Sequence, residues 1–477
     1  MSDVKGQVVS GVKWSLFGKL VSQLFSWVVT FIVIRILTPN DYGIIELSTA
    51  LITLGIALGV SGFSDVIVQK KQHDTKLCAQ VFTLAIGFNG ALFLLIFSSA
   101  GAVANWYDSP QLADVIRLLS LNILLLSFSV VPAGILKREM NFKRLSLIQM
   151  VQAFVNSLTT LTLALLGFEY WAIAFGSLIA MVTSVILLNI YSASHLRLTT
   201  DFSEFRSHFN FGMFTIINRL LHFIFLKADS FIIGKVLGTK SLGYYSVGSQ
   251  LANLPLEKVA QTLNEVSFVG YAKVKEDRAA TAYYYLQSSK IIALMAFSIF
   301  WGMASIAEPL ISVLLGDKWL NAGIIFQLLA LVMPFRIYQL ATHSAIAGIG
   351  HPKFNTRNLM VLCVVIPSSV YIGLQWDLVG AALGWSLGYL LFFVWMIRRS
   401  LKFLSVQPID FIRSILVPLC AGSLMLLVNF LLYQYLGEEN NFTTLLCLIF
   451  AGAVSFISVV LVFDKSSVVK LKSLLHK

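Results

Sequence analysis

Long apolar stretches follow one another along most of this chain, and they constrain its fold more than any other feature. A helix needs about 20 apolar residues to cross the hydrocarbon core of a bilayer. Backbone groups find no water in lipid, so each stretch of that length should be helical. The sequence therefore predicts an all-α integral membrane protein with about 14 transmembrane helices. Divided at its polar and turn-rich breaks, the chain has predicted spans at 14–37, 43–67, 77–101, 112–136, 145–167, 170–192, 209–236, 243–267, 284–307, 321–348, 358–375, 377–398, 412–435 and 442–463.

The composition excludes a water-soluble surface for most of the chain. Charged residues make up 12% of the sequence and hydrophobic residues 57%, whereas a soluble domain carries about 25% charged residues. The net charge of +12 would suit nucleic acid if the cations shared one folded face. They stand instead in small groups between apolar stretches, so no nucleic-acid partner is expected.

The sequence carries no signature of a cofactor, a metal site or a catalytic centre. Its four cysteines lie inside apolar stretches, without a CxxC or Cys/His cluster. It has no GxxxxGK[ST], HExxH or GxSxG motif. Its predicted outer loops are short, whereas a membrane enzyme such as a polysaccharide polymerase should have a substantial one. We therefore expect a protein that is not an enzyme, with no cofactor, no metal and no catalytic residue.

The distribution of Lys and Arg between the loops predicts the orientation. With the N-terminus in the cytoplasm, the loops and tails on that side contain 24 Lys and Arg residues, and the opposite loops contain only Lys240 and Lys318. Such a bias marks the cytoplasmic side of membrane proteins. Both termini are therefore predicted to be cytoplasmic, and residues 464–477 to form a basic tail along the inner leaflet.

The sequence repeats itself at a spacing of about 200 residues, which drifts slightly along the chain. The aligned pairs include Phe31 and Phe231, Arg35 and Lys235, Gly43 and Gly243, and Glu169 and Asp377. The repeat predicts six-helix lobes at 1–200 and 201–400, followed by two additional helices at 401–463. Because six is even, the lobes would be parallel repeats about an axis along the membrane normal, with a central cleft suited to alternating access.

Several basic residues lie inside the predicted spans. An Arg or Lys near the bilayer centre costs about 3 kcal/mol, so such residues should face protein or water rather than lipid. Guanidinium and ammonium groups bind phosphate oxygens, and core cations match or outnumber core acids in both halves. This balance favours an anionic substrate, such as one with a phosphate or diphosphate group. The candidate substrate-binding residues are Lys19, Arg35, Arg219, Lys227, Arg336 and His343.

Some of these residues have structural alternatives. Arg35 could extend to the membrane interface. On a helix, Arg219, His222 and Asp229 fall within one 80° arc, which fits either an internal polar network or a stripe on the cleft wall. His343 shares a helix face with Arg336, but His343 by itself is more simply explained as a packed, hydrogen-bonded histidine.

Carboxylates inside the spans are candidates for ion coupling. Such groups carry protons or Na⁺ in coupled transporters, although neutralisation of nearby Arg and Lys is an alternative role. The candidates are Glu46, Asp65, Asp229, Glu257 and Glu265.

Several segments resemble the Wzx-type polysaccharide flippases of the multidrug/oligosaccharidyl-lipid/polysaccharide exporter superfamily. They include "RILTPNDYGIIELSTALI", "GFSDVIVQKK" and "ADSFIIGKVLGTKSLGYYSVGSQLANLP". The resemblance runs from about residue 10 to residue 400 and is strongest to the branch that exports colanic acid or teichuronic acid repeat units.

The resemblance implies a flippase in the bacterial inner membrane, with two bundles around a cleft. Its substrate would be an undecaprenyl-diphosphate-linked oligosaccharide, moved from the cytoplasmic to the outer leaflet. Membrane lipids and the polysaccharide polymerase machinery are the further expected partners. The alternative within the same superfamily is a cation-coupled exporter of small molecules, whose cleft should be acidic.

Overall fold

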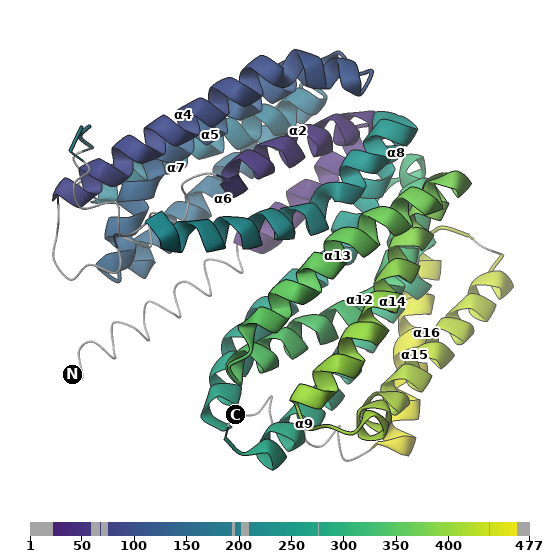
Figure 1. Ribbon diagram of the computed structural model, residues 1–477. Coiled ribbons are helices and arrows are strands. Elements are labelled where there is room, and N and C mark those ends of the chain that lie inside the picture. Colours follow the sequence, from purple (N-terminus) through teal and green to yellow (C-terminus); the bar gives the residue numbers. More distant parts are fainter. Residues whose placement is uncertain are drawn as a thin grey trace. The chain divides into compact units, whose positions relative to one another are not determined.

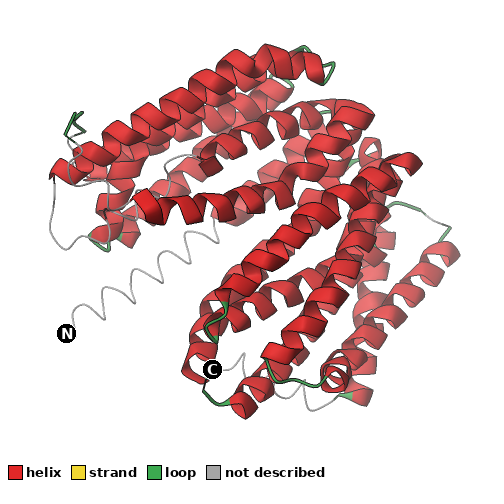
Figure 2. Ribbon diagram, in the orientation of Figure 1, coloured by secondary structure: helices red, strands yellow, loops and turns green. Residues whose placement is uncertain are grey.

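The protein is almost entirely helical in the part that a computed structural model describes, which comprises residues 22–58, 67, 75–192, 196–201, 209–274, 276–437 and 439–464. Within these residues there is no strand (Figure 2). The chain forms two compact units, Met1–Gly243 (unit 1) and Tyr244–Lys477 (unit 2). Each unit is described by itself.

Unit 1 is built around α5, which packs against α2, α4, α6 and α7 (Figure 1). Its buried face includes Leu112, Val115 and Ile116. The part of α8 up to Gly243 also belongs to this unit, and the predicted boundary between the repeat lobes near residue 200 stays a prediction. The helices of unit 1 are Ser22–Ile36, α2 (Pro39–Leu58), α4 (Thr75–Trp106), α5 (Gln111–Arg138), α6 (Phe142–Leu165), α7 (Tyr170–Ser192) and the part of α8 (Phe209–Val274) up to Gly243.

In unit 2, α14 packs against both α12 and α13, and α15 and α16 lie side by side at one edge (Figure 1). Gly373 and Gly380 let α13 and α14 approach closely, because a Cβ on either would overlap the backbone of the other. The elements after α8 are α9 (Arg278–Ala296), the π-helix η3 (Phe297–Trp301), α10 (Gly302–Ser305), α11 (Ala307–Leu315), η4 (Asp317–Trp319), α12 (Leu320–Gly348), α13 (Pro352–Gly373), η5 (Leu374–Trp376), α14 (Asp377–Phe403), α15 (Pro408–Tyr435) and α16 (Phe442–Phe463).

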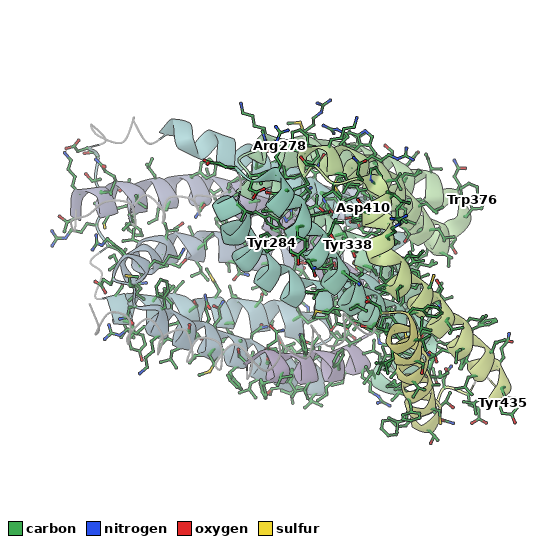
Figure 3. The ribbon with its side chains drawn as sticks, turned by 90° about the horizontal axis from the view of Figure 1, so that it is seen from below. Arg278, Tyr284, Tyr338, Trp376, Asp410 and Tyr435 are labelled. Atoms are coloured by element: carbon green, nitrogen blue, oxygen red, sulfur yellow. The ribbon has the colours of Figure 1, made fainter. Side chains whose placement is uncertain are left out.

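The helices are those of a multi-pass membrane protein, as the sequence predicts. Ten helical segments of the described residues are long and apolar enough to cross a bilayer. Described helices overlap all the predicted ranges, but the number fourteen itself stays a prediction. Large apolar side chains such as Leu391 and Phe450, each 73% exposed, face outward, and Trp376 and Tyr435 project at helix ends (Figure 3). This pattern suits lipid with an interfacial aromatic belt.

Short polar side chains cap the N-termini of several helices. The Thr38 hydroxyl donates to Asp41 Oδ2 over 2.7 Å, and the Asp41 amide donates back to Thr38 Oγ1 over 3.3 Å. This reciprocal cap, with Pro39 at the first helical position, starts α2. Asp277 caps α9 and Asn441 caps α16 by accepting from backbone amides. These caps satisfy amides that the helix itself leaves unpaired.

The backbone conformation supports the predicted repeat. Three residues with positive φ between helices of the first half have counterparts in the second half, at separations of 208, 210 and 208 residues. The pairs are Asp108 and Gly316, Met140 and Gly350, and Glu169 and Asp377. Left-handed backbone is rare away from glycine, so its recurrence at a nearly constant spacing indicates equivalent helix connections in the two halves.

Inside unit 1, Gly43 and Gly243, which the repeat aligns, each pack closely against backbone near the other glycine. A Cβ on Gly43 would overlap the carbonyl group of Thr239, and a Cβ on Gly243 would overlap that of Pro39. Since residues 39 and 239 are also separated by 200, the contact has local two-fold symmetry. The same contact is extended by the Thr239 hydroxyl, which donates to Asn40 Oδ1 over 2.5 Å. Glycine at both positions permits this backbone-to-backbone approach.

Replacing either glycine by alanine should destabilise the protein. We expect Gly43→Ala or Gly243→Ala to cost about 1–3 kcal/mol, because the added methyl group meets rigid backbone rather than a mobile side chain. The measurement is thermal unfolding of the purified protein in detergent. Gly90→Ala is the matched control, since a Cβ there has nothing within 4 Å. An unchanged midpoint in both test variants would contradict the close contact.

Candidate functional site

Unit 1 contains an ion pair inside its apolar helices. Lys227 Nζ of α8 lies 2.8 Å from Glu46 Oε1 of α2. The Ser230 hydroxyl donates to the same carboxylate oxygen over 2.8 Å. The Lys227 and Glu46 side chains keep 27% and 17% exposure. The pair therefore neutralises two charges in a low-dielectric region while leaving each side chain partly accessible.

Local helix geometry brings these groups together. The α2 cap at Thr38 sets where the helix begins, and Glu46 follows two turns later on the side that faces α8. Lys227 and Ser230 are three residues apart on α8 and so share a face. Asp229 lies next to them but is 6% exposed, and its Oδ1 accepts from the Ser230 amide over 2.8 Å. One predicted coupling carboxylate, Glu46, thus contacts one predicted cation, Lys227, and Asp229 lies two residues further along the same helix.

The other predicted residues of unit 1 have different surroundings. Arg35 is exposed and stands one residue before the end of its helix, a position that suits the interfacial alternative. Arg219 is half-buried, His222 is exposed and Asp229 is buried. The three residues of the predicted arc therefore differ in their exposure to solvent. Lys19 and Asp65 lie outside the described residues.

Lys235, the counterpart of Arg35 in the repeat, anchors the connection between α4 and α5. Its ammonium donates to the Trp106 carbonyl over 2.5 Å, lies 3.2 Å from Asp108 Oδ2, and is 5.1 Å from the Trp106 ring centroid. Beside it, the Tyr107 hydroxyl donates to the Phe231 carbonyl over 3.3 Å, and burial raises the pKa of Tyr107. These contacts tie the α4–α5 connection to α8, which is a structural role.

Unit 2 contains a cation, Arg336, inside its apolar helices. Arg336, in the middle of α12, donates from Nη1 to Asn253 Oδ1 of α8 over 2.7 Å. Its guanidinium carbon lies 5.6 Å from the ring centroid of Trp385 in α14. A cation over an indole face gains roughly 0.5–2 kcal/mol. Arg336 is half-buried, so three helices position a planar cation that keeps partial access.

Aromatic and amide groups continue this cluster. The Trp385 and Tyr389 rings stack with centroids 5.3 Å apart and planes 3° from parallel. The Tyr389 hydroxyl donates to Gln339 Oε1, one turn along α12 from Arg336. These contacts fix the rotamers around the guanidinium. We call Arg336, Asn253, Trp385, Tyr389 and Gln339 the arginine cluster; it can present a bidentate donor to an anion.

His343, predicted beside Arg336, occupies a separate contact. Its Nε2 lies 3.2 Å from Asn358 Nδ2 of α13, and its carbonyl accepts from Asn355 Nδ2 over 3.0 Å. With the amide as donor, Nε2 is the acceptor and the ring is neutral. These bonds are those of a packed histidine that joins α12 to α13.

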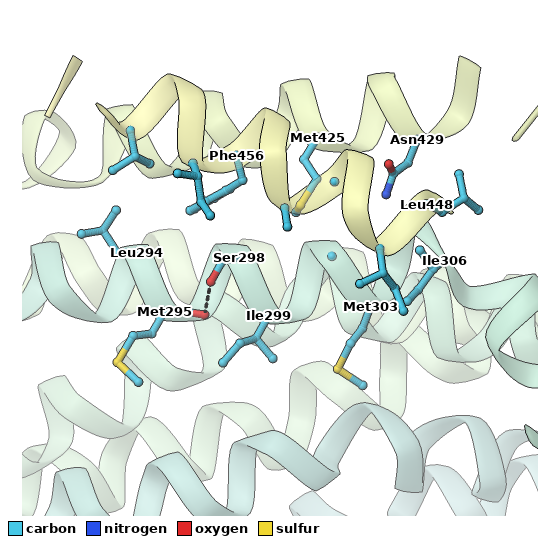
Figure 4. A pocket seen from close by; sticks show the side chains of 16 residues that line it. Leu294, Met295, Ser298, Ile299, Met303, Ile306, Met425, Asn429, Leu448 and Phe456 are labelled. Atoms are coloured by element: carbon cyan, nitrogen blue, oxygen red, sulfur yellow. Dashed lines mark hydrogen bonds between the residues drawn. The ribbon is translucent and has the colours of Figure 1, made fainter. Parts of the chain in front are cut away.

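Unit 2 also contains an apolar cavity of about 630 Å³ between the α9–η3–α10 segment and the helices α15 and α16 (Figure 4). Of the described residues that line it, all except Ser298 and Asn429 are apolar or glycine. The Ser298 hydroxyl donates to the Met295 carbonyl over 3.0 Å, and the Asn429 amide donates to Ser305 Oγ over 2.8 Å. A π-helix forms part of one wall; such segments are frequent at functional sites. The cavity suits a hydrocarbon chain.

Sequence reasoning missed the neutral partners of the charged residues. Asn253, Trp385 and Ser230 have no motif, and only their proximity in space marks them. The side chains of Glu257 and Glu265 lie outside the described residues. Across the described parts of the chain, no group of three or more His, Cys, Asp and Glu side chains is placed to hold a metal.

Comparison with known proteins places the chain among membrane transporters. The family model described as "Polysaccharide biosynthesis protein" matches residues 32–323. The chain is 24% identical to the teichuronic acid biosynthesis protein TuaB of Bacillus subtilis (strain 168), over 71% of this chain and 70% of TuaB. It is 21% identical to the lipopolysaccharide biosynthesis protein WzxC of Escherichia coli (strain K12), over 90% of this chain and 88% of WzxC.

The fold has a solved counterpart in lipid II flippase MurJ, in its inward closed conformation. The TM-score is 0.73 at 16% identity, over 94% of this chain and 99% of the MurJ chain. The helical architecture is thus the fold of this solved membrane protein. The chain belongs to the polysaccharide biosynthesis protein family. The resemblance to the Wzx-type flippases is confirmed, and the protein is a transporter of polysaccharide biosynthesis.

Proposed function

We propose that this protein is a flippase for undecaprenyl-diphosphate-linked polysaccharide repeat units, such as those of colanic acid. It moves them from the cytoplasmic to the outer leaflet of the bacterial inner membrane by alternating access of its two repeat halves. Both termini face the cytoplasm, as the Lys and Arg bias indicates. The protein catalyses no covalent step, and the polymerase that extends the repeat units receives its product.

The arginine cluster supports an anionic substrate. A diphosphate presents several oxygens that match the Arg336 fork. Arg336 is held by Asn253 Oδ1 at 2.7 Å and by the Trp385 face, so little side-chain freedom is lost when an anion binds. Arg219 is a further cationic contact in this proposal, and Glu46 with Asp229 provides carboxylates for ion coupling.

The observation that carries the lipid-linked substrate is the apolar cavity of unit 2. A soluble sugar phosphate has no use for a cavity of about 630 Å³ lined by side chains such as Met303, Met425 and Phe456. A polyprenyl chain does, because its methylene groups are as apolar as the lining. The cavity lies against α15 and α16, the two helices beyond the predicted six-helix repeats. This addition to the repeats distinguishes a carrier of lipid-linked sugars from a small-molecule exporter in our proposal.

The test is reconstitution with a defined diphosphate-linked glycan and measurement of its transfer between leaflets. We expect Ala453→Trp, which fills part of the cavity, to slow transfer of a long-prenyl substrate at least about tenfold, equivalent to 1.4 kcal/mol. A short-prenyl analogue should be affected less. The control is Val454→Trp on the neighbouring, 47% exposed position of α16, which does not line the cavity.

Two outcomes would refute the proposal. One is wild-type protein that transfers no diphosphate-linked glycan but exports small cations in exchange for H⁺ or Na⁺. The other is an Ala453→Trp variant that slows short-prenyl and long-prenyl substrates equally, which would separate the cavity from the lipid tail.

A further inference from the structure

A polar pocket of about 280 Å³ lies at one end of unit 2, where three chain connections meet. Its walls come from the start of α9, the turn between α12 and α13, and the end of α14 with the following turn. Three basic side chains line it, one from each connection: Arg278, His351 and Lys402. Thr281 and Ser405 add hydroxyl groups, and Ser405 has a left-handed backbone with φ of 55°.

The positive charge of this pocket has no carboxylate set against it in the part of the chain that the structure describes. Within that part, no ion pair or hydrogen bond occupies the Arg278 guanidinium or the Lys402 ammonium, and no described lining residue is acidic. The adjacent Asp277 serves another role, because its Oδ1 caps α9 by accepting from the Ala280 amide over 2.9 Å. Arg, Lys and hydroxyl donors around one polar cavity form a receptor for a phosphate group.

The surroundings of the pocket are those of the lipid headgroup layer. Tyr283 and Tyr284, in the first turns of α9, are 58% and 51% exposed. Phe403 on the pocket wall is 44% exposed, with its ring 5.2 Å from that of His351. Exposed aromatic rings at helix ends are typical of the membrane–water interface. These surroundings favour a phosphate group that a lipid carries over a soluble one.

We propose that this pocket binds the phosphate of an anionic phospholipid headgroup in the cytoplasmic leaflet. That leaflet is the one the Lys and Arg bias assigns to these three connections, and basic pockets between membrane helices on that side select anionic headgroups. The site holds together the ends of α9, α12 and α14. It is distinct from the arginine cluster, and its existence does not depend on the transported substrate.

The test uses the full-length protein, purified in detergent and stripped of lipid. Binding of phosphatidylglycerol and of phosphatidylcholine in mixed micelles is measured for wild type and two double variants. Arg278→Gln with Lys402→Gln removes the pocket charges. Arg398→Gln with Arg413→Gln removes two charges from exposed side chains of α14 and α15 that do not line the pocket. Thermal unfolding of each variant verifies that it is folded.

We expect wild type to prefer phosphatidylglycerol, and the pocket variant to bind it about 25-fold more weakly. The Arg398/Arg413 variant should stay within about threefold of wild type, since it loses only diffuse attraction. Equal losses in the two double variants would overturn the proposal and reduce these cations to a topology signal. Equal binding of the two lipids would overturn it as well. Inorganic phosphate alone binding as tightly as phosphatidylglycerol would replace the lipid with a soluble anion.

Discussion

Arg336→Ala should lower transfer of a diphosphate-linked glycan about 10- to 100-fold while the protein still reaches the membrane. A hydrogen bond to a charged group contributes about 1.5–3 kcal/mol, so the loss of one such bond between the guanidinium and the diphosphate accounts for an effect of this size. The residue is positioned by Asn253 and the Trp385 ring, so its removal takes away a preformed donor rather than a mobile one. The measurement is leaflet transfer in proteoliposomes, normalised to the amount of folded protein.

Two further variants separate binding from folding at this position. Arg336→Lys keeps the charge but loses the planar fork, so transfer should fall less than with alanine. Asn253→Ala keeps the cation but frees it, and should raise the substrate concentration needed for half-maximal transfer. Arg219→Ala, at the half-buried position of unit 1, is predicted to impair transfer as well. Wild-type transfer by both Arg219→Ala and Arg336→Ala would remove these cations from the mechanism.

Lys227→Met should destabilise unit 1 by about 1–3 kcal/mol and also abolish most transfer. The substitution leaves the Glu46 carboxylate in an apolar region. Among the described residues, the Ser230 hydroxyl is then the hydrogen-bond donor that remains to it. Breaking a fully buried pair costs about 3–5 kcal/mol, and the partial exposure of both side chains reduces that figure. Thermal unfolding in detergent and transfer in proteoliposomes measure the two effects separately.

The double variant Glu46→Gln with Lys227→Met distinguishes the two roles left open for this pair. It removes both charges, so stability should return toward wild type. Transfer should stay low if Lys227 contacts the diphosphate or Glu46 carries a coupling ion. Recovery of both stability and transfer would mean that the pair serves neutralisation alone. Arg117→Met is the matched control, because its ion pair with Asp114 is exposed on both sides and contributes about 0–1 kcal/mol.

Much of the architecture could be predicted without coordinates. The apolar stretches located the helices, and the repeat aligned Gly43 with Gly243, whose matching contacts only the structure shows. The positive φ values of Glu169 and Asp377 agree with the aligned pair. The place where the compact units divide could not be predicted. It depends on the part of α8 up to Gly243 packing against α2, and a hydropathy pattern says nothing about which neighbour a span contacts.

The candidate site was predictable only as a set of residue types. The cost of a charge in lipid identified Lys227, Glu46 and Arg336 as residues that need partners, because that cost is a property of one residue in one span. It could not identify the partners.

The sequence by itself therefore determined the solvent, the helical class, the repeat and the residues whose charge demands explanation, since these follow from contiguous composition and spacing. Only the tertiary structure decided the pairing of Lys227 with Glu46, 181 residues away, and of Arg336 with Asn253, 83 residues away. The physical reason is that helix rotation and helix neighbours depend on side-chain packing between distant segments. In lipid this packing, rather than burial from water, selects the contacts.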